Sequence, residues 1–217
     1  MHYRHILDSL RRFDPPAALN LPAGRENRIN LALNENSLGF SPQVSQALTA
    51  SLAGASRYPS TFCDELRHKL AGIYDLPPQR FLFGSGIFEI LSLISEVFVA
   101  EGDEVIIPTP SFGWYNLITR LNGGNIVAVP LQQHTIDLQA VLAAITPQTR
   151  LIWLCNPHNP MGTLVSSGAL QTFLAQVPAD IPVVLDEAYG EYAVAGEGPA
   201  GVALARQYNP VSYTHLR

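Results

Sequence analysis

Short apolar runs alternate with longer amphipathic stretches over most of the chain, from residue 41 to residue 211. A short apolar run between turn residues is typical of a buried strand, and an apolar residue at every third or fourth position is typical of a helix that covers a sheet. The alternation predicts a three-layer α/β fold, in which a mainly parallel sheet has helices on both faces. The predicted strands are residues 81–83, 104–107, 125–129, 151–155 and 183–185.

Helical patterns fill the segments between these strands, and two more precede the first strand. The predicted helices are residues 43–52, 64–73, 88–100, 114–121, 138–145 and 168–176. Prolines such as Pro15 and Pro16 indicate that residues 1–40 form an extended N-terminal arm rather than a domain. One large domain, residues 41–211, is expected to follow the arm. Residues 212–217 do not continue the pattern and are interpreted as a non-native or out-of-pattern tail.

Composition is that of a globular protein with a buried core, since 47% of the 217 residues are hydrophobic and 14% are charged. The net charge of −5 provides no basic surface for nucleic acid. Charged residues interrupt the N-terminus, and no apolar run approaches the length of a membrane span. Cys63 and Cys155 form no Cys-x-x-Cys motif. We therefore expect a cytoplasmic protein that binds neither nucleic acid nor a membrane and holds no metal.

Two loops after predicted strands carry residues that suit a phosphate group and a flat ring. The turn Gly84-Ser85-Gly86 precedes a helix, whose free N–H groups offer a seat for phosphate. Its alternative is an ordinary turn in which glycine only permits a positive φ angle. Phe112 follows the strand 104–107, at the edge where ligands bind in open parallel sheets, and it could stack on a planar ring. Its alternative is an aromatic residue that covers the sheet end.

The loop after the strand 151–155 carries a candidate amide. Two X-Pro steps, Asn156-Pro157 and Asn159-Pro160, stiffen this loop, so that it can aim one amide, for which Asn159 is the candidate. A simple Asx turn is the alternative for Asn159. His158 beside it is expected to be solvated, and no second His or Cys stands at metal-ligand spacing from it.

A carboxylate and a phenol follow the last predicted strand. Asp186 closes the apolar run 183–185, and a poorly solvated carboxylate of this kind needs a partner. A protonated pyridine nitrogen meets that need, while Tyr189 and an amide could hold an oxygen on the same ring. The alternatives for Asp186 are a salt bridge to an arginine such as Arg150 and a cap on the next helix.

Taken in order, these four motifs resemble those of fold-type I pyridoxal phosphate enzymes, specifically class I/II aminotransferases. The segments Asn34-Glu35-Asn36-Ser37-Leu38-Gly39 and Arg57-Tyr58-Pro59 are similar to the arm and the Arg-Tyr-Pro segment of the histidinol-phosphate aminotransferase group. The resemblance covers residues 31–192. It implies the large domain of this fold and pyridoxal 5'-phosphate as the cofactor.

The resemblance also implies a role for individual residues. The backbone of Gly86, Ile87 and Phe88 would bind the cofactor phosphate, and Phe112 would stack on the ring. Asn159 and Tyr189 would bind the ring oxygen, and Asp186 the ring nitrogen. Tyr58 would reach the phosphate of a neighbouring subunit, so a homodimer is implied, and Asn36 would lie at the substrate entrance.

Three departures from the family pattern accompany this resemblance. Ile87 and Phe88 stand where the group has a small and then a polar residue, and Met161 replaces a usual threonine. The lysine that carries the cofactor would fall at or beyond residue 217, since the only lysine present is Lys69. The small C-terminal domain is likewise missing. Residues 41–211 are therefore interpreted as an incomplete cofactor-binding domain without its catalytic lysine.

The function expected of the full-length parent is transamination of an amino acid or an amino-acid-like phosphate, with a keto acid as acceptor, in amino-acid biosynthesis. The chain itself is expected to be inactive. One alternative is a pyridoxal phosphate-dependent decarboxylase or lyase, such as threonine-phosphate decarboxylase. Another is a non-catalytic cofactor-binding protein, and a structural or interaction protein is the third.

Overall fold

The computed structural model describes residues 31, 33–193, 201–208 and 211–214, in two compact units that divide after Phe81. The sequence placed a boundary after residue 40, and most of the predicted arm lies outside the described residues. The described residues of the smaller unit form two helices, α2 (Pro42–Ser51) and α3 (Asp64–Tyr74), and two short 3-10 turns, Leu52–Gly54 and Pro78–Arg80.

The larger unit is built on a parallel sheet of five strands in the order β2-β1-β3-β4-β5. These strands are β1 (Glu104–Thr109), β2 (Asn125–Pro130), β3 (Thr149–Cys155), β4 (Val183–Asp186) and β5 (Val211–Thr214). The predicted parallel α/β fold is thus confirmed. Residues 212–214, assigned to the tail by the sequence pattern, pair with β4.

The first predicted strand, residues 81–83, is wrong. Phe81 has extended backbone angles, but residues 81–83 pair with no strand in the described part of the chain. The Phe81 ring lies 6.3 Å from that of Tyr74, whereas Leu82 is 63% exposed. Local packing therefore accounts for Phe81 but not for Leu82.

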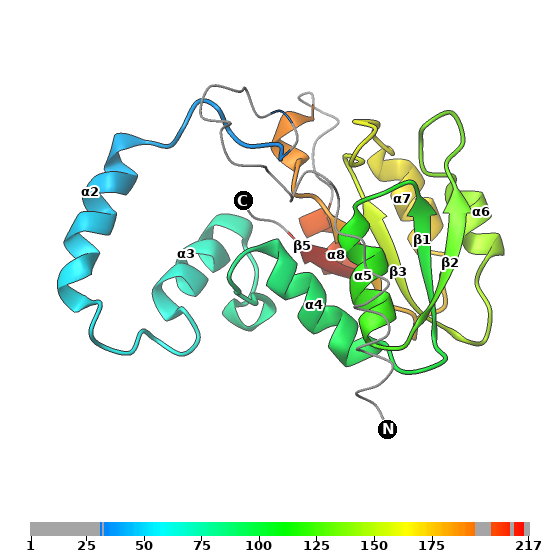
Figure 1. The fold of residues 1–217 in the computed structure, drawn as a ribbon, viewed down its shortest axis with the longest axis horizontal. Coiled ribbons are helices and arrows are strands. Elements are labelled where there is room, and N and C mark those ends of the chain that lie inside the picture. Colours follow the sequence, from blue (N-terminus) through cyan, green and yellow to red (C-terminus); the bar gives the residue numbers. More distant parts are fainter. Residues whose placement is uncertain (1–30, 32, 194–200, 209–210, 215–217) are drawn as a thin grey trace, which may run out of the picture. The chain divides into compact units, whose positions relative to one another are not determined.

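Helices cover both faces of the sheet, which gives the three layers (Figure 1). The helices are α4 (Ile87–Phe98), α5 (Gly113–Leu121), α6 (Leu138–Ala143), α7 (Ser167–Leu174) and α8 (Gly201–Gln207). Buried residues of α4 and α5 pack on one face with Val105, Ile107 and Trp153. Buried residues of α6, α7 and α8 pack on the other face with Ile106 and Ile152. Alternate residues of β1, β3 and β4 thus serve the two layers.

The strand order places a topological switch between β1 and β3, because the chain continues from β1 to one side and from β3 to the other. Ligands of open α/β sheets bind outside the carboxyl ends of the strands at such a point. Cys155 at the end of β3 is in register with Asp186 at the end of β4. The loops that carry Phe112, Asn159 and Tyr189 therefore leave the sheet at one edge.

Candidate functional site

Asp186 is the buried centre of the candidate site, with only 3% of its surface exposed. Its Oδ2 accepts a hydrogen bond of 2.6 Å from the phenol of Tyr115, and its Oδ1 accepts one of 3.0 Å from the backbone N–H of Ala188. Arg150, the example given for a salt-bridge partner, pairs instead with Asp103, with Nε and Oδ1 3.6 Å apart. Arg150 lies at the opposite end of β3, five residues before Cys155.

Tyr115 is a member of the site that the candidate residues predicted from the sequence did not include. It is buried on α5, and its ring stacks on that of Trp153 at 5.1 Å and an interplanar angle of 8°. Burial, followed by the neighbouring acidic groups of Cys155 and Asp186, raises the pKa of the Tyr115 phenol well above its usual value. The phenol therefore stays protonated and donates to Asp186. The available signal was a polar tip on the buried face of a helix, which needs a partner.

Cys155 lies next to these two residues, at the end of β3 and in register with Asp186. Its thiol donates to the carbonyl oxygen of Pro157 at 3.3 Å, and its Sγ accepts the N–H of Asn159 at 3.4 Å. Burial, followed by the charge on Asp186, raises the pKa of the Cys155 thiol to about 12. The thiol is thus neutral at physiological pH and serves to hold the loop rather than to act as a nucleophile.

The loop after β3 is anchored through Asn156. The Asn156 side chain donates to the Val165 carbonyl at 3.0 Å and accepts the Val165 N–H at 2.7 Å, while its backbone N–H donates to the Asp186 carbonyl at 2.9 Å. Further along, the Asn159 amide donates to the phenol oxygen of Tyr189 at 3.5 Å. The structure therefore brings Asn159 and Tyr189 together from two loops, and the Asn159 side chain makes no Asx turn among the described residues.

His158 differs from its prediction, because it is buried rather than solvated, with 4% of its surface exposed. Neither ring nitrogen has a hydrogen-bond partner in the described part of the structure. Burial lowers the pKa of His158 below its ordinary value, so the imidazole is neutral at physiological pH. No sequence pattern indicates this burial, which comes from the fold of the loop around His158, whose backbone bonds Thr163 and Gly162.

Phe112 is linked to the buried carboxylate by Tyr115, because its ring contacts the Tyr115 ring and the Tyr115 phenol bonds Asp186. It precedes the first residue of α5 and is half-buried. Its ring meets those of Phe88 and Tyr115 edge to face, each at a centroid distance of 5.4 Å. Phe88 in turn contacts Trp114 at 4.8 Å. The departure at Phe88 therefore adds an aromatic contact next to Phe112.

The glycine turn meets the start of α4 at Gly86, whose φ angle is +85°. The Glu89 carboxylate accepts the N–H of Ser85. A Cβ at Gly84 would lie 2.8 Å from the Glu89 Oε2 and 2.9 Å from the Ile90 Cδ1, so the ends of these side chains would have to shift to admit it. The first-turn N–H groups of α4, from Ile87 and Phe88, have no partner inside the helix. They are the donors that the predicted phosphate seat needs.

Two predicted residues belong to the smaller unit and are described by themselves. The Asn36 amide donates to the Gly39 carbonyl at 2.9 Å, and its side-chain oxygen accepts the Leu38 N–H at 3.1 Å, which closes a local turn. The Tyr58 side chain is fully exposed. Lys69 is exposed on α3. The predicted roles of Asn36 and Tyr58 stay predictions.

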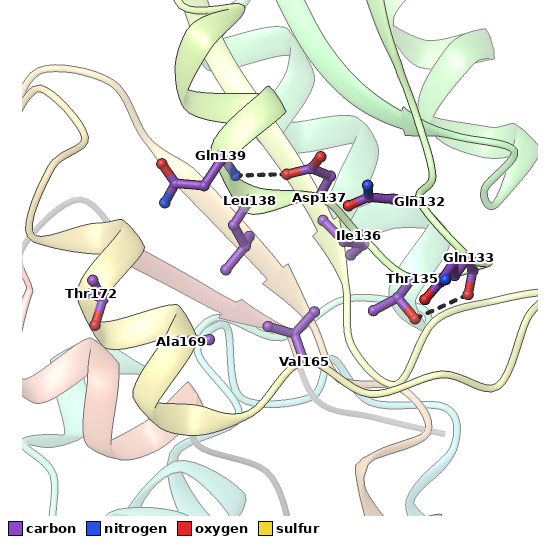
Figure 2. A pocket seen from close by; sticks show the side chains of 10 residues that line it. All are labelled: Gln132, Gln133, Thr135, Ile136, Asp137, Leu138, Gln139, Val165, Ala169 and Thr172. Atoms are coloured by element: carbon purple, nitrogen blue, oxygen red, sulfur yellow. Dashed lines mark hydrogen bonds between the residues drawn. The ribbon is translucent and has the colours of Figure 1, made fainter.

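A separate open hollow of about 560 Å³ lies between the loop after β2 and α7 (Figure 2). None of the predicted cofactor residues lines it. Among the described residues, no group of three or more His, Cys, Asp or Glu side chains is placed to hold a metal ion. No described helix has the length and apolar character needed to cross a membrane.

The chain is similar in sequence to a known protein family and to named members of it. The family model "Aminotransferase class I and II" matches residues 26–214. The chain is 40% identical over 188 residues to histidinol-phosphate aminotransferase of Caldicellulosiruptor saccharolyticus, covering 87% of this chain and 52% of that protein. It is also 40% identical over 183 residues to the enzyme of Moorella thermoacetica, covering 84% of this chain and 47% of that protein.

A solved structure agrees with these matches. Histidinol-phosphate aminotransferase from Sinorhizobium meliloti, in complex with pyridoxal-5'-phosphate, superposes with a TM-score of 0.84 at 28% identity, covering 97% of this chain and 57% of that chain. The chain spans about half the length of the relatives it matches. Because the family model covers most of the sequence, the chain belongs to the class I and II aminotransferases.

Proposed function

We propose that this chain is the cofactor-binding part of a pyridoxal phosphate-dependent aminotransferase. The observation that carries the proposal is the buried Asp186 carboxylate at the carboxyl edge of the sheet, next to the strand whose loop holds Asn159. A buried carboxylate is stable when it faces a cation or several donors. A protonated ring nitrogen would supply the cation, and the Asn159–Tyr189 pair would face the ring oxygen.

The residues present fit this cofactor. Asp186 would accept the ring N–H, Phe112 would cover the ring, and Ile87 and Phe88 would offer backbone N–H groups to the phosphate. The Gly86 N–H donates to the Gly84 carbonyl at 2.8 Å and would have to give up that bond to join them. When bound, pyridoxal phosphate supplies an electron sink for negative charge on the substrate carbon. Asp186 would support this chemistry by keeping the ring nitrogen protonated, and the loop held by Asn156 and Cys155 would fix Asn159 at the ring oxygen.

The whole protein is proposed to transfer an amino group from an amino-acid-like phosphate to a keto acid, in amino-acid biosynthesis. The two relatives at 40% identity, both named histidinol-phosphate aminotransferase, support this choice over the decarboxylase or lyase and over a non-catalytic or structural protein. A homodimer is proposed as well, with Tyr58 reaching the cofactor phosphate of the neighbouring subunit and Asn36 at the substrate entrance. The cytoplasmic location stays a prediction.

The 217-residue chain itself is proposed to bind the cofactor without a covalent bond and without turnover, since Lys69 is its only lysine. Borohydride reduction with pyridoxal phosphate, followed by peptide mass spectrometry, tests this. No stoichiometric label is expected on Lys69. Full labelling of Lys69, or transamination well above that of free cofactor, would contradict the proposal.

Equilibrium dialysis tests the site itself. Wild type should bind pyridoxamine 5'-phosphate, and Asp186→Ala should weaken binding at least about tenfold, the scale of one hydrogen bond to a charged group. The control Tyr208→Phe removes a phenol that bonds the Gln171 carbonyl on α7, and it should bind as wild type does. Equal affinity of wild type and Asp186→Ala would contradict the proposed role of Asp186.

A further inference from the structure

The phenol of Tyr115 and the carboxylate of Asp186 are both buried and lie 2.6 Å apart, although 71 positions separate them in the sequence. We propose that Tyr115 is a positioning residue that keeps the bound cofactor's ring nitrogen protonated by donating its hydroxyl hydrogen to Asp186. This inference rests on the proposed function, because it assigns Tyr115 to the same site. Tyr115 itself need not touch the cofactor.

The physical reason lies in how a proton is shared between a carboxylate and a pyridine in a dry site. The proton can stay on the ring, which leaves two charges, or move to the carboxylate, which leaves none, and desolvation favours the neutral pair. Hydrogen bonds donated to the carboxylate stabilise its charged form. Asp186 receives such bonds at both oxygens, from Tyr115 and from the Ala188 N–H. Both bonds therefore favour the protonated ring.

The structure keeps Tyr115 in this role in three ways. Its ring is clamped by stacking on Trp153, which fixes the direction of the hydroxyl group. Burial raises the pKa of its phenol, so the group remains a donor throughout the physiological pH range. Phe112 is the residue directly before α5, so one helix sets both the proposed ring contact and the phenol three residues later.

The test follows the proton with cofactor labelled at the ring nitrogen. Pyridoxamine 5'-phosphate carrying ¹⁵N in the ring is suitable, because it lacks the aldehyde that would react with Lys69. The ¹⁵N resonance of the bound ligand is recorded near neutral pH for wild type, Tyr115→Phe and the control Tyr208→Phe. Asp186→Asn, which removes the charge, provides the reference for an unprotonated ring.

Wild type and Tyr208→Phe should show a protonated ring nitrogen. In Tyr115→Phe the resonance should move toward that of Asp186→Asn, because losing one donor of this strength changes the ratio of protonated to neutral ring about tenfold. Infrared spectra of the ligand complex of Tyr115→Phe should show a protonated Asp186 carboxyl group that the wild-type complex lacks. A ring-nitrogen resonance in Tyr115→Phe equal to that of wild type would overturn the inference.

Failure of the proposed function gives a different result. If wild type binds no ligand, or if its ring-nitrogen resonance already equals that of Asp186→Asn, then Asp186 does not hold the ring and both proposals fall. If Tyr115→Phe does not fold, as judged by near-ultraviolet circular dichroism, wild type labelled with ¹³C at the phenol carbon of tyrosine replaces it. Ligand binding should shift the Tyr115 signal in wild type but much less in Asp186→Asn, and equal shifts would overturn the inference.

Discussion

At the scale of single residues, the site depends on polar groups that share one buried space. Tyr115 and Asp186 satisfy each other at 2.6 Å. Removal of one partner leaves the other without this hydrogen bond, whereas removal of both leaves neither a phenol nor a carboxylate that lacks it. Their contributions to stability should therefore be coupled, even without the cofactor.

We expect Asp186→Ala and Tyr115→Phe each to lower the free energy of unfolding by about 1–3 kcal/mol, and the double variant to lose less than the sum. Urea titrations of the cofactor-free chain measure all three. Tyr208→Phe is the matched control, since its partly exposed phenol should matter by less than about 0.5 kcal/mol. Strict additivity of the two buried substitutions would show that the pair is not coupled.

His158 should make stability depend on pH. Its pKa is lowered by burial, so unfolding restores the ordinary value and takes up a proton in acid. The stability that the neutral His158 contributes is therefore fully present above its pKa in the unfolded chain, about 6.5. It declines as the pH falls below that value, by at most about 1.4 kcal/mol per pH unit. Urea titrations between pH 7.5 and about pH 5 should show a smaller decline for His158→Phe than for wild type. Parallel declines would contradict this.

At the scale of elements, the loops after strands could be predicted and the contacts between helices and loops could not. Asn159 and Asp186 follow clear apolar runs, so the parallel sheet alone places them at one edge. Tyr115 and His158 gave no such signal, because their burial depends on side chains from other elements. Residues 81–83 misled for a related reason, since apolar composition does not specify whether a strand partner exists.

The backbone conformation of Gly86, at the start of α4, can be tested by a single substitution. Its φ angle of +85° disfavours any side chain, although an added Cβ would have no atom within 4 Å. Gly86→Ala should therefore lower the free energy of unfolding by about 1–2 kcal/mol through backbone strain alone. Gly168→Ala is the control, because Gly168 lies within α7 with equal space and no positive φ angle, and it should be neutral or stabilising. Equal effects would contradict the strain.

At the scale of the molecule, one sheet joins two apolar layers. Neighbouring residues Ile106 and Ile107 are both completely buried, one in each layer. Trp114 and Trp153 both belong to the layer of α4 and α5. Tryptophan fluorescence therefore reports on that layer, while Ile106 lies on the opposite side of the sheet.

We expect Ile106→Ala and Ile107→Ala each to lower the free energy of unfolding by about 2–5 kcal/mol. Because both layers share the sheet, both should shift the fluorescence transition in urea, including Ile106→Ala on the side without tryptophan. Gln139→Ala, at an exposed position of α6, should shift nothing. A normal fluorescence transition in Ile106→Ala would mean that the two layers unfold separately.

The strand order also has a consequence for synthesis on the ribosome. Phe112 and Asn159 follow β1 and β3, and Asp186 ends β4, so the groups proposed to hold the ring come from three distant stretches of the chain. The nascent chain cannot assemble them until β4 has emerged and docked beside β3. Cofactor binding can therefore stabilise only the last steps of this assembly. The pairing of β1, β2 and β3 must occur before a complete cofactor site exists.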